Sequence, residues 1–312
     1  MWPNVFGFLK GFFLLPGLII TGCNLLNYYF PDNKTSQFCT SALFIVLLIV
    51  ASIIIGLISI WPRREVSSII SGTDIRVSCK ICDLLSQNED IVIAVNTTFD
   101  TSTEADFVST TSLQGKYQSK YYKNKLTNLD ELIEKALVNE DISRILKDGR
   151  KTKTKEYQVG TVAKITHPSS FFRDCFHTYL LALAKANASG VTETTSEDFA
   201  FALYRLWDFL KVQGNKTKLN IPLIGTGRSG LNCERMTVAK EIIFSFVAYA
   251  KSTKIIDELV ICITMDDYEK HNMDLGELQE YLNVVCKSDS IIDAKKNSFK
   301  KLSTPINIMS KE

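Results

Sequence analysis

Two long stretches of this 312-residue chain lack charge altogether. No Lys, Arg, Asp or Glu occurs from residue 11 to 30 or from residue 41 to 62. Each run approaches the ~20 apolar residues that span a bilayer core. Lys10 precedes the first run and Arg63 follows the second, so the positive-inside rule places both chain ends in the cytoplasm. The sequence therefore predicts a two-helix transmembrane hairpin over residues 1–64, with a buried globular hairpin as the alternative.

The chain also has few histidines that could bind a metal, and its net charge is small. The chain has three histidines, none in a metal-ligand pattern, and a formal net charge of +2. Cys79 and Cys82 form a CxxC, but no second CxxC follows to complete a zinc site. The surrounding residues alternate like a strand, which places the two thiols on opposite faces. We therefore expect no metal, no cofactor, no redox pair between these two residues, and no binding of nucleic acid.

Strands and helices alternate after the apolar runs, which is typical of a layered α/β domain. The prediction is a mixed sheet sandwiched by helices over residues 75–288, between a polar linker at 65–74 and a polar tail at 289–312. Expected strands cover 75–81, 90–96, 151–165 (as an edge strand or hairpin), 176–185, 221–224 and 258–265. Expected helices cover 129–147, 196–210, 233–251 and 276–285, the first of them with a cap at Thr127 and Asp130.

A glycine loop carries the most specific chemical signal. Residues 221–230 read IPLIGTGRSG, a buried strand followed by three glycines and then a helix. Such a unit directs backbone N–H groups and a helix dipole at one point, which favours a phosphate or diphosphate. A dinucleotide-binding Rossmann unit does not fit, because Asp257 and Glu258 precede the next strand instead of closing it. A P-loop is excluded, because no Gly-Lys-Ser/Thr follows.

The same residues resemble a known family. IPLIGTGRSGLN looks like the diphosphate loop of macro domains, and the region from Asp83 to Asn96, with DIVIAVN, looks like their first half. The resemblance covers roughly residues 75–285. With two apolar segments ahead of it, the chain is similar to the transmembrane–macro effector of type II Thoeris anti-phage defence. That resemblance implies an ADP-ribose-derived ligand, such as histidine–ADP-ribose made from NAD by a TIR-domain partner.

The resemblance also implies the binding residues. Asp83 would accept a hydrogen bond from the adenine amino group, or else only form a turn. Asn96 would reach the distal ribose, or else only cap its strand. Asp100 and Thr101, in the opposing loop, would contact the part of the ligand beyond the diphosphate. The loop that would wrap the diphosphate consists of Gly225, Thr226, Gly227, Arg228, Ser229 and Gly230, with Arg228 adding a charge-assisted hydrogen bond or remaining solvated.

Departures from the family pattern favour binding over catalysis. TTFDTSTEADF replaces the usual glycine-rich loop after the second strand, and Cys82 stands where the family has glycine. The leading hypothesis is a non-enzymatic effector in the bacterial inner membrane, with the lipid bilayer as a partner, which senses the nucleotide, forms a homo-oligomer and disrupts the membrane. A membrane-tethered ADP-ribosyl hydrolase acting on ADP-ribose esters is the alternative. A membrane adaptor without ligand is the third possibility.

Overall fold

The computed structural model divides the chain into two compact units, residues 1–63 and 64–312, each described here by itself. In the first unit the structure describes residues 17, 19–25, 28–29 and 42–59. In the second it describes 64–288 except 104–106, 148–152, 169–173, 187–191, 216 and 228–229. The predicted polar tail at 289–312 lies outside the described residues.

The first unit contains helix α3, Ala42–Ser59, within the second predicted membrane segment. Among the described residues, no helix has both the length and the apolar character that a bilayer crossing needs. This contradicts the predicted transmembrane hairpin and the multi-pass inner-membrane location. Much of the first predicted segment, 11–30, lies outside the described residues.

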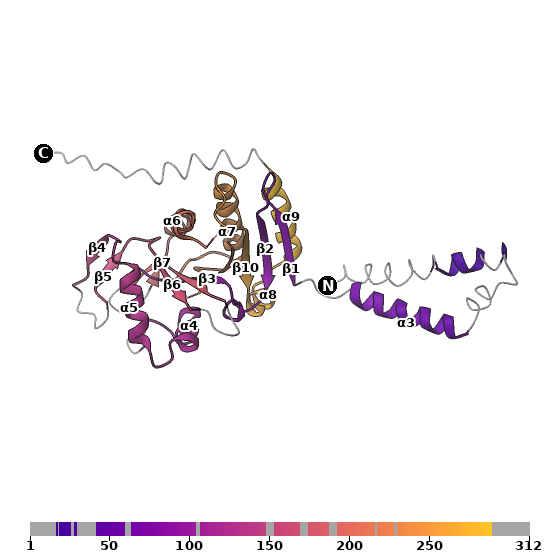
Figure 1. Ribbon diagram of the computed structural model, residues 1–312, viewed down its shortest axis with the longest axis horizontal. Coiled ribbons are helices and arrows are strands. Elements are labelled where there is room, and N and C mark those ends of the chain that lie inside the picture. The colour runs from indigo at the N-terminus through magenta and orange to yellow at the C-terminus, as the bar shows by residue number, and fades with distance from the viewer. Residues whose placement is uncertain are drawn as a thin grey trace. The chain divides into compact units, whose positions relative to one another are not determined.

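The second unit is built on a mixed eight-stranded sheet (Figure 1). Strand order is β1-β2-β10-β9-β3-β7-β6, and β8 pairs with β7. The strands β2, β10, β9, β3 and β7 are parallel, and β1, β6 and β8 are antiparallel to their neighbours. The bounds are β1 Glu65–Ile69, β2 Arg76–Ile81, β3 Asp90–Asn96, β6 Val162–His167, β7 Phe176–Ala186, β8 Thr192–Glu193, β9 Lys218–Pro222 and β10 Glu258–Ile263. A mixed α/β sheet is what the sequence predicted, although β1 lies within the expected linker.

Helices cover both faces of this sheet, because side chains alternate along each strand. In β3, Val92 packs into one core and Ile91 and Ile93 into the other. The helices α6, α7 and α9 contribute to the first core, and α4 and α5 to the second (Figure 1). The bounds are η1 Leu84–Ser86, α4 Leu113–Tyr121, α5 Leu126–Ala136, α6 Ser196–Gln213, α7 Arg235–Ala250, α8 Met265–Lys270 and α9 Leu275–Lys287.

One predicted helix is wrong in its second half. The helix expected over 129–147 begins earlier, at Leu126, and ends at Ala136. Residues Ile142–Ile145 instead form β4, which pairs antiparallel with β5, Lys155–Tyr157. The expected cap is also wrong, since the helix starts at Lys125 without a side-chain cap. Asp130 instead accepts hydrogen bonds from Thr101 and Lys153, because the loop after β3 folds over this helix.

The sheet changes winding direction between β9 and β3. The chain continues from β9 to β10 on one side, and from β3 toward β7 and β6 on the other. Among the described residues, β3 and β9 pair only at Asp90–Leu219 and Ile91–Asn220, and the strands then separate. Ligands of open α/β sheets bind in the crevice beyond the carboxyl ends of the strands at such a switch point. The strand topology therefore predicts a ligand site beyond the carboxyl ends of β9 and β3.

Candidate functional site

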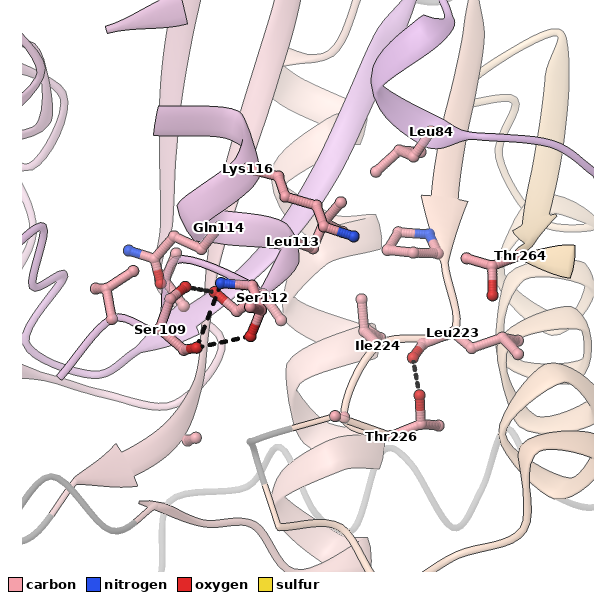
Figure 2. A pocket seen from close by; sticks show the side chains of 18 of the residues that line it. Leu84, Ser109, Ser112, Leu113, Gln114, Lys116, Leu223, Ile224, Thr226 and Thr264 are labelled. Atoms are coloured by element: carbon pink, nitrogen blue, oxygen red, sulfur yellow. Dashed lines mark hydrogen bonds between the residues drawn. The ribbon is translucent and has the colours of Figure 1, made fainter. Parts of the chain in front are cut away.

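A cavity of about 540 Å³ opens at this switch point (Figure 2). Its lining comes from the carboxyl ends of β2, β3, β7, β9 and β10, and from the loop that leads into α4. A volume of this size suits a small-molecule ligand, since such pockets measure about 300–1,000 Å³. The residues that line the cavity include Cys82, Asp83, Asn96, Ser112, Gln114, Lys116, Gly225, Thr226, Gly227, Cys262, Thr264 and Asp267.

The glycine loop forms one wall of the cavity. The strand β9 ends at Pro222, which has no N–H to continue the ladder. Ile224 N donates to Pro222 O at 2.8 Å and Thr226 Oγ1 donates to Leu223 O at 2.7 Å, the second of which Figure 2 shows. Gly225 then reverses the chain at a φ of 86°, a conformation that favours glycine.

Three consecutive backbone donors of this loop remain open. Among the described residues, the N–H groups of Gly225, Thr226 and Gly227 have no hydrogen-bond partner. Gly225 is buried and Gly227 is exposed, so the row of donors runs from the interior to the mouth of the cavity. Buried N–H groups are almost always paired in folded proteins. An anion with several acceptor oxygens would satisfy these donors.

The opposite wall comes from α4. Ser112 caps this helix by accepting a hydrogen bond from Gly115 N at 3.1 Å. The first turn contains no acidic residue, so nothing there offsets the positive end of the helix dipole. Figure 2 shows the Lys116 side chain extending from α4 into the cavity, on the side that faces Leu223 and Ile224. No described carboxylate forms an ion pair with Lys116, which leaves its ammonium group available to an anionic ligand.

Asp83 stands at the end of β2, on the rim of the cavity. Its Oδ1 accepts a hydrogen bond from Leu85 N at 3.1 Å and so caps η1. The residue is exposed, and its second carboxylate oxygen accepts no hydrogen bond from any described residue. Asp83 therefore forms the turn through Oδ1, and its second carboxylate oxygen remains available to a hydrogen-bond donor of a ligand.

Two thiols lie beside Asp83 in the same wall. The Sγ atoms of Cys82 and Cys262 are 3.1 Å apart. Their hydrogen bond, helped by Lys80, lowers the pKa of the Cys82 thiol, although burial, Asp83 and Glu65 act in the opposite direction. The same hydrogen bond, together with burial, raises the pKa of the Cys262 thiol. The pair is therefore asymmetric, with Cys82 the more readily ionised member.

Asn96 lines the cavity, but its amide group is committed to the loop after β3. Its Nδ2 donates to Asp100 Oδ2 at 3.0 Å, and its Oδ1 accepts from Asp100 N at 2.9 Å and from Thr98 Oγ1 at 3.2 Å. Asp100 is fully buried and also accepts from Lys153 N at 3.1 Å. This network fixes the loop that carries Phe99 at a φ of 52°.

The sequence matches a family of known proteins over most of the sheet that carries this site. The family model described as "Thoeris protein ThsA, Macro domain" matches residues 77–264, which is more than half of the chain. The chain belongs to the Thoeris ThsA macro domain family. This confirms the resemblance to the macro-domain effectors of Thoeris defence.

Individual relatives are distant. The chain is 23% identical over 186 residues to the Thoeris protein ThsA of Bacillus amyloliquefaciens (strain Y2), and the match covers 59% of each protein. The chain thus spans about three-fifths of the length of this curated relative. Solved structures of similar fold include an Oceanobacillus iheyensis macrodomain with ADP, at a TM-score of 0.46 and 13% identity, covering 69% of this chain and 97% of that one. The same macrodomain with MES bound has a TM-score of 0.45 and 14% identity, with 69% and 97% covered. At these scores neither structure bears on function.

The structure brings some of the predicted site residues together and separates others. Asp83, Asn96, Gly225, Thr226 and Gly227 all line the cavity. Asp100 and Thr101 do not, because both are buried in the loop network instead of facing the cavity. Gly230 lies beyond the lining, with a φ of 73°. Arg228 and Ser229 lie outside the described residues.

Sequence reasoning missed the wall opposite the glycine loop. Ser112, Gln114 and Lys116 belong to α4, which no hydrophobic period announces, since its sequence LQGKYQSKY is mostly polar. The one available signal was Ser112, a preferred N-cap residue. Thr264 and Asp267 were missed for a similar reason. They open the short helix α8, where Thr264 accepts from Asp267 N and Asp267 pairs with Arg235 Nε at 2.7 Å.

Proposed function

We propose that the chain is a non-enzymatic sensor of an ADP-ribose-derived nucleotide in Thoeris anti-phage defence, and that the cavity at the β9–β3 switch point is its ligand pocket. The observation that carries the proposal is the row of unpartnered N–H groups at Gly225, Thr226 and Gly227. Membership of the Thoeris ThsA macro domain family supports it independently.

The pocket offers suitable groups to the diphosphate and to the adenine of such a nucleotide. A diphosphate has enough acceptor oxygens for the three open N–H groups, and it would also attract the Lys116 ammonium. The free oxygen of Asp83 suits the amino group of an adenine. Hydrogen bonds to charged groups contribute about 1.5–3 kcal/mol each, so losing one of them should weaken binding by about tenfold or more.

Binding without turnover is the form of the proposal that the side chains favour. The loop network occupies Oδ1 of Asn96 and one of its two amide N–H groups, so the side chain offers a ligand at most one N–H donor. None of the histidines 167, 177 and 271 lines the cavity, so no described histidine can act there as a general base. An ADP-ribosyl hydrolase remains the competing function.

Supply of the ligand by a TIR-domain enzyme, and formation of a homo-oligomer on binding, stay part of the proposal. Ligand drives assembly only if it binds the assembled state more tightly than the resting one. Light scattering with and without ADP-ribose measures this directly. We do not propose membrane disruption, since it depended on membrane spans that no described helix supplies.

Titration calorimetry of the full chain tests the central claim. ADP-ribose and ADP should bind, and adenosine, which lacks the diphosphate, should bind at least about tenfold more weakly, because losing even one charge-assisted hydrogen bond costs about 1.5 kcal/mol. Equal binding of adenosine would place the diphosphate elsewhere. Release of ADP-ribose from an ADP-ribose ester by the purified chain, followed by mass spectrometry, would instead support the hydrolase.

A further inference from the structure

Cys82 and Cys262 meet in the pocket wall although 180 residues separate them in the sequence. The CxxC spacing pairs Cys82 with Cys79, but Cys79 is fully buried in the core on the opposite face of the sheet. The residue that Cys82 does face is Cys262, on the neighbouring strand β10. Both line the cavity, and neither has a role in the proposed recognition of the nucleotide.

The sheet fixes how closely these two thiols approach. The strands β2 and β10 are parallel, with Lys80 beside Cys262 and Ile81 beside Ile263. One residue further on, Cys82 N still donates to Ile263 O at 3.0 Å, so the ladder extends past the end of β2. The sulfur atoms are 3.1 Å apart, and a disulfide requires about 2.05 Å. The two sulfur atoms are therefore about 1 Å from bonding distance.

Access and ionisation complete the site. Cys82 is partly exposed toward the cavity, whereas Cys262 is buried beneath it. The lowered pKa of the Cys82 thiol favours the thiolate, which is the nucleophile in thiol chemistry. A reactive thiol that is exposed, beside a second thiol that can resolve its oxidation product, is the usual arrangement of an oxidation-sensitive pair.

We propose that Cys82 and Cys262 form a dithiol that a peroxide oxidises to a disulfide within the wall of the nucleotide pocket. The Cys82 thiolate attacks one oxygen of hydrogen peroxide. An S–O bond forms, the O–O bond breaks, and the hydroxide that leaves is protonated to water. The Cys262 sulfur then attacks the Cys82 sulfenic acid. The S–S bond forms, the S–O bond breaks, and the hydroxyl group leaves as water with the proton of the Cys262 thiol. Two thiols and one peroxide thus give a disulfide and two waters.

Peptide mapping of the full chain tests this pair. The protein is treated with hydrogen peroxide, its remaining thiols are alkylated, and the digest is analysed by mass spectrometry. The expected product is a Cys82–Cys262 cross-linked peptide that has lost two hydrogens and disappears after reduction with dithiothreitol. Recovery of both residues as alkylated thiols, at a peroxide dose that oxidises the exposed Cys175, overturns the proposal. A link from Cys82 to another cysteine overturns it as well.

Single substitutions separate the two roles. Cys82→Ser should abolish the cross-link, and Cys175→Ser, a matched change outside the pocket, should leave it intact. Cys262→Ser should leave a Cys82 sulfenic acid that dimedone traps, and an unlabelled Cys82 in that variant, once folded, speaks against Cys82 as the attacking thiol. If a variant fails to fold, the map of the wild-type chain still decides. The test needs no nucleotide, so its result is independent of whether the pocket binds ADP-ribose.

Discussion

Gly227 and Gly225 lie two residues apart in the same loop, but a side chain at each position meets a different environment. At Gly227, an added Cβ has no described heavy atom within 4 Å, and the residue does not adopt a positive φ. At Gly225, φ is +86° and an added Cβ lies 3.0 Å from Leu231 Cδ2 and 3.3 Å from Leu231 Cβ. We therefore predict that Gly227→Val impairs binding without impairing the fold, and that Gly225→Ala impairs the fold.

The magnitudes follow from these contacts. Surface changes without a special conformation usually alter the free energy of unfolding by less than about 0.5 kcal/mol, so Gly227→Val should shift Tm by less than about 2 °C in a unit of this size. A left-handed conformation costs a residue with a Cβ about 1–2 kcal/mol, so Gly225→Ala should lower Tm by about 2–8 °C, and by more if Leu231 cannot move.

Binding should respond in the opposite order. A valine at 227 would project from the mouth of the row of open N–H groups and hold a diphosphate away from it. Loss of one or two charge-assisted hydrogen bonds, at about 1.5–3 kcal/mol each, weakens binding by about tenfold or more. Calorimetry with ADP-ribose measures this, and thermal melting of the same samples measures stability.

The clearest refutation would be a Gly227→Val protein that melts like the wild type and binds ADP-ribose with unchanged affinity. The diphosphate would then not lie against this loop. A Gly225→Ala protein with wild-type Tm would show that the loop does not need its left-handed turn. Either result would remove the geometric basis of the proposed pocket.

Three further predictions concern the other walls. Lys116→Gln should weaken ADP-ribose binding and make it less dependent on salt than in the wild type. Lys123→Gln, a matched change at an exposed lysine outside the cavity lining, should leave binding unchanged. Equal affinities of the two variants for ADP-ribose would exclude a role for Lys116. Asp100→Ala should lower the free energy of unfolding by at least about 2 kcal/mol, because two buried donors, Asn96 Nδ2 and Thr98 Oγ1, lose their acceptor at about 1–3 kcal/mol each, and an unchanged Tm would contradict the loop network. Because its pKa is lowered, Cys82 should be alkylated by iodoacetamide at a lower pH than a free cysteine in a model peptide, with the rate falling only as pH drops through that lowered pKa; coinciding pH profiles would count against this.

The fold was largely predictable where burial alone sets the pattern. The strand Asp90–Asn96 has the same bounds in sequence and structure, because it is buried on both faces and ends at a polar loop. Helix α6 begins at Ser196, as expected, and Thr195 caps it. The segment 129–147 was mispredicted because Ile142–Ile145 has helical spacing but pairs with β5, which lies downstream in the sequence. Periodicity within one segment cannot reveal a strand that depends on pairing with another segment.

The site was predictable only where backbone chemistry decides it. A glycine-rich loop after a strand predicts a tight turn at the end of that strand, so Gly225 and Gly227 could be placed in the cavity from the sequence. The residues Lys116 and Cys262 could not, since only the folded topology brings α4 and β10 to the same crevice. Cys82 illustrates the difference, because its sequence neighbour at CxxC spacing lies on the other face of the sheet and its spatial neighbour is 180 residues away.

Asn96 and Asp83 show how a structural role and a binding role divide between two polar residues of one pocket. Asn96 uses its Oδ1 and one of its two amide N–H groups to hold the loop after β3, which leaves one N–H without a described partner. Asp83 spends one oxygen on capping η1 and keeps the other. The open groups that the proposal assigns to a nucleotide are one carboxylate oxygen of Asp83, the ammonium group of Lys116 and the three backbone N–H groups of the glycine loop. All of these groups recognise charge and shape, and this is the basis on which we propose sensing over hydrolysis.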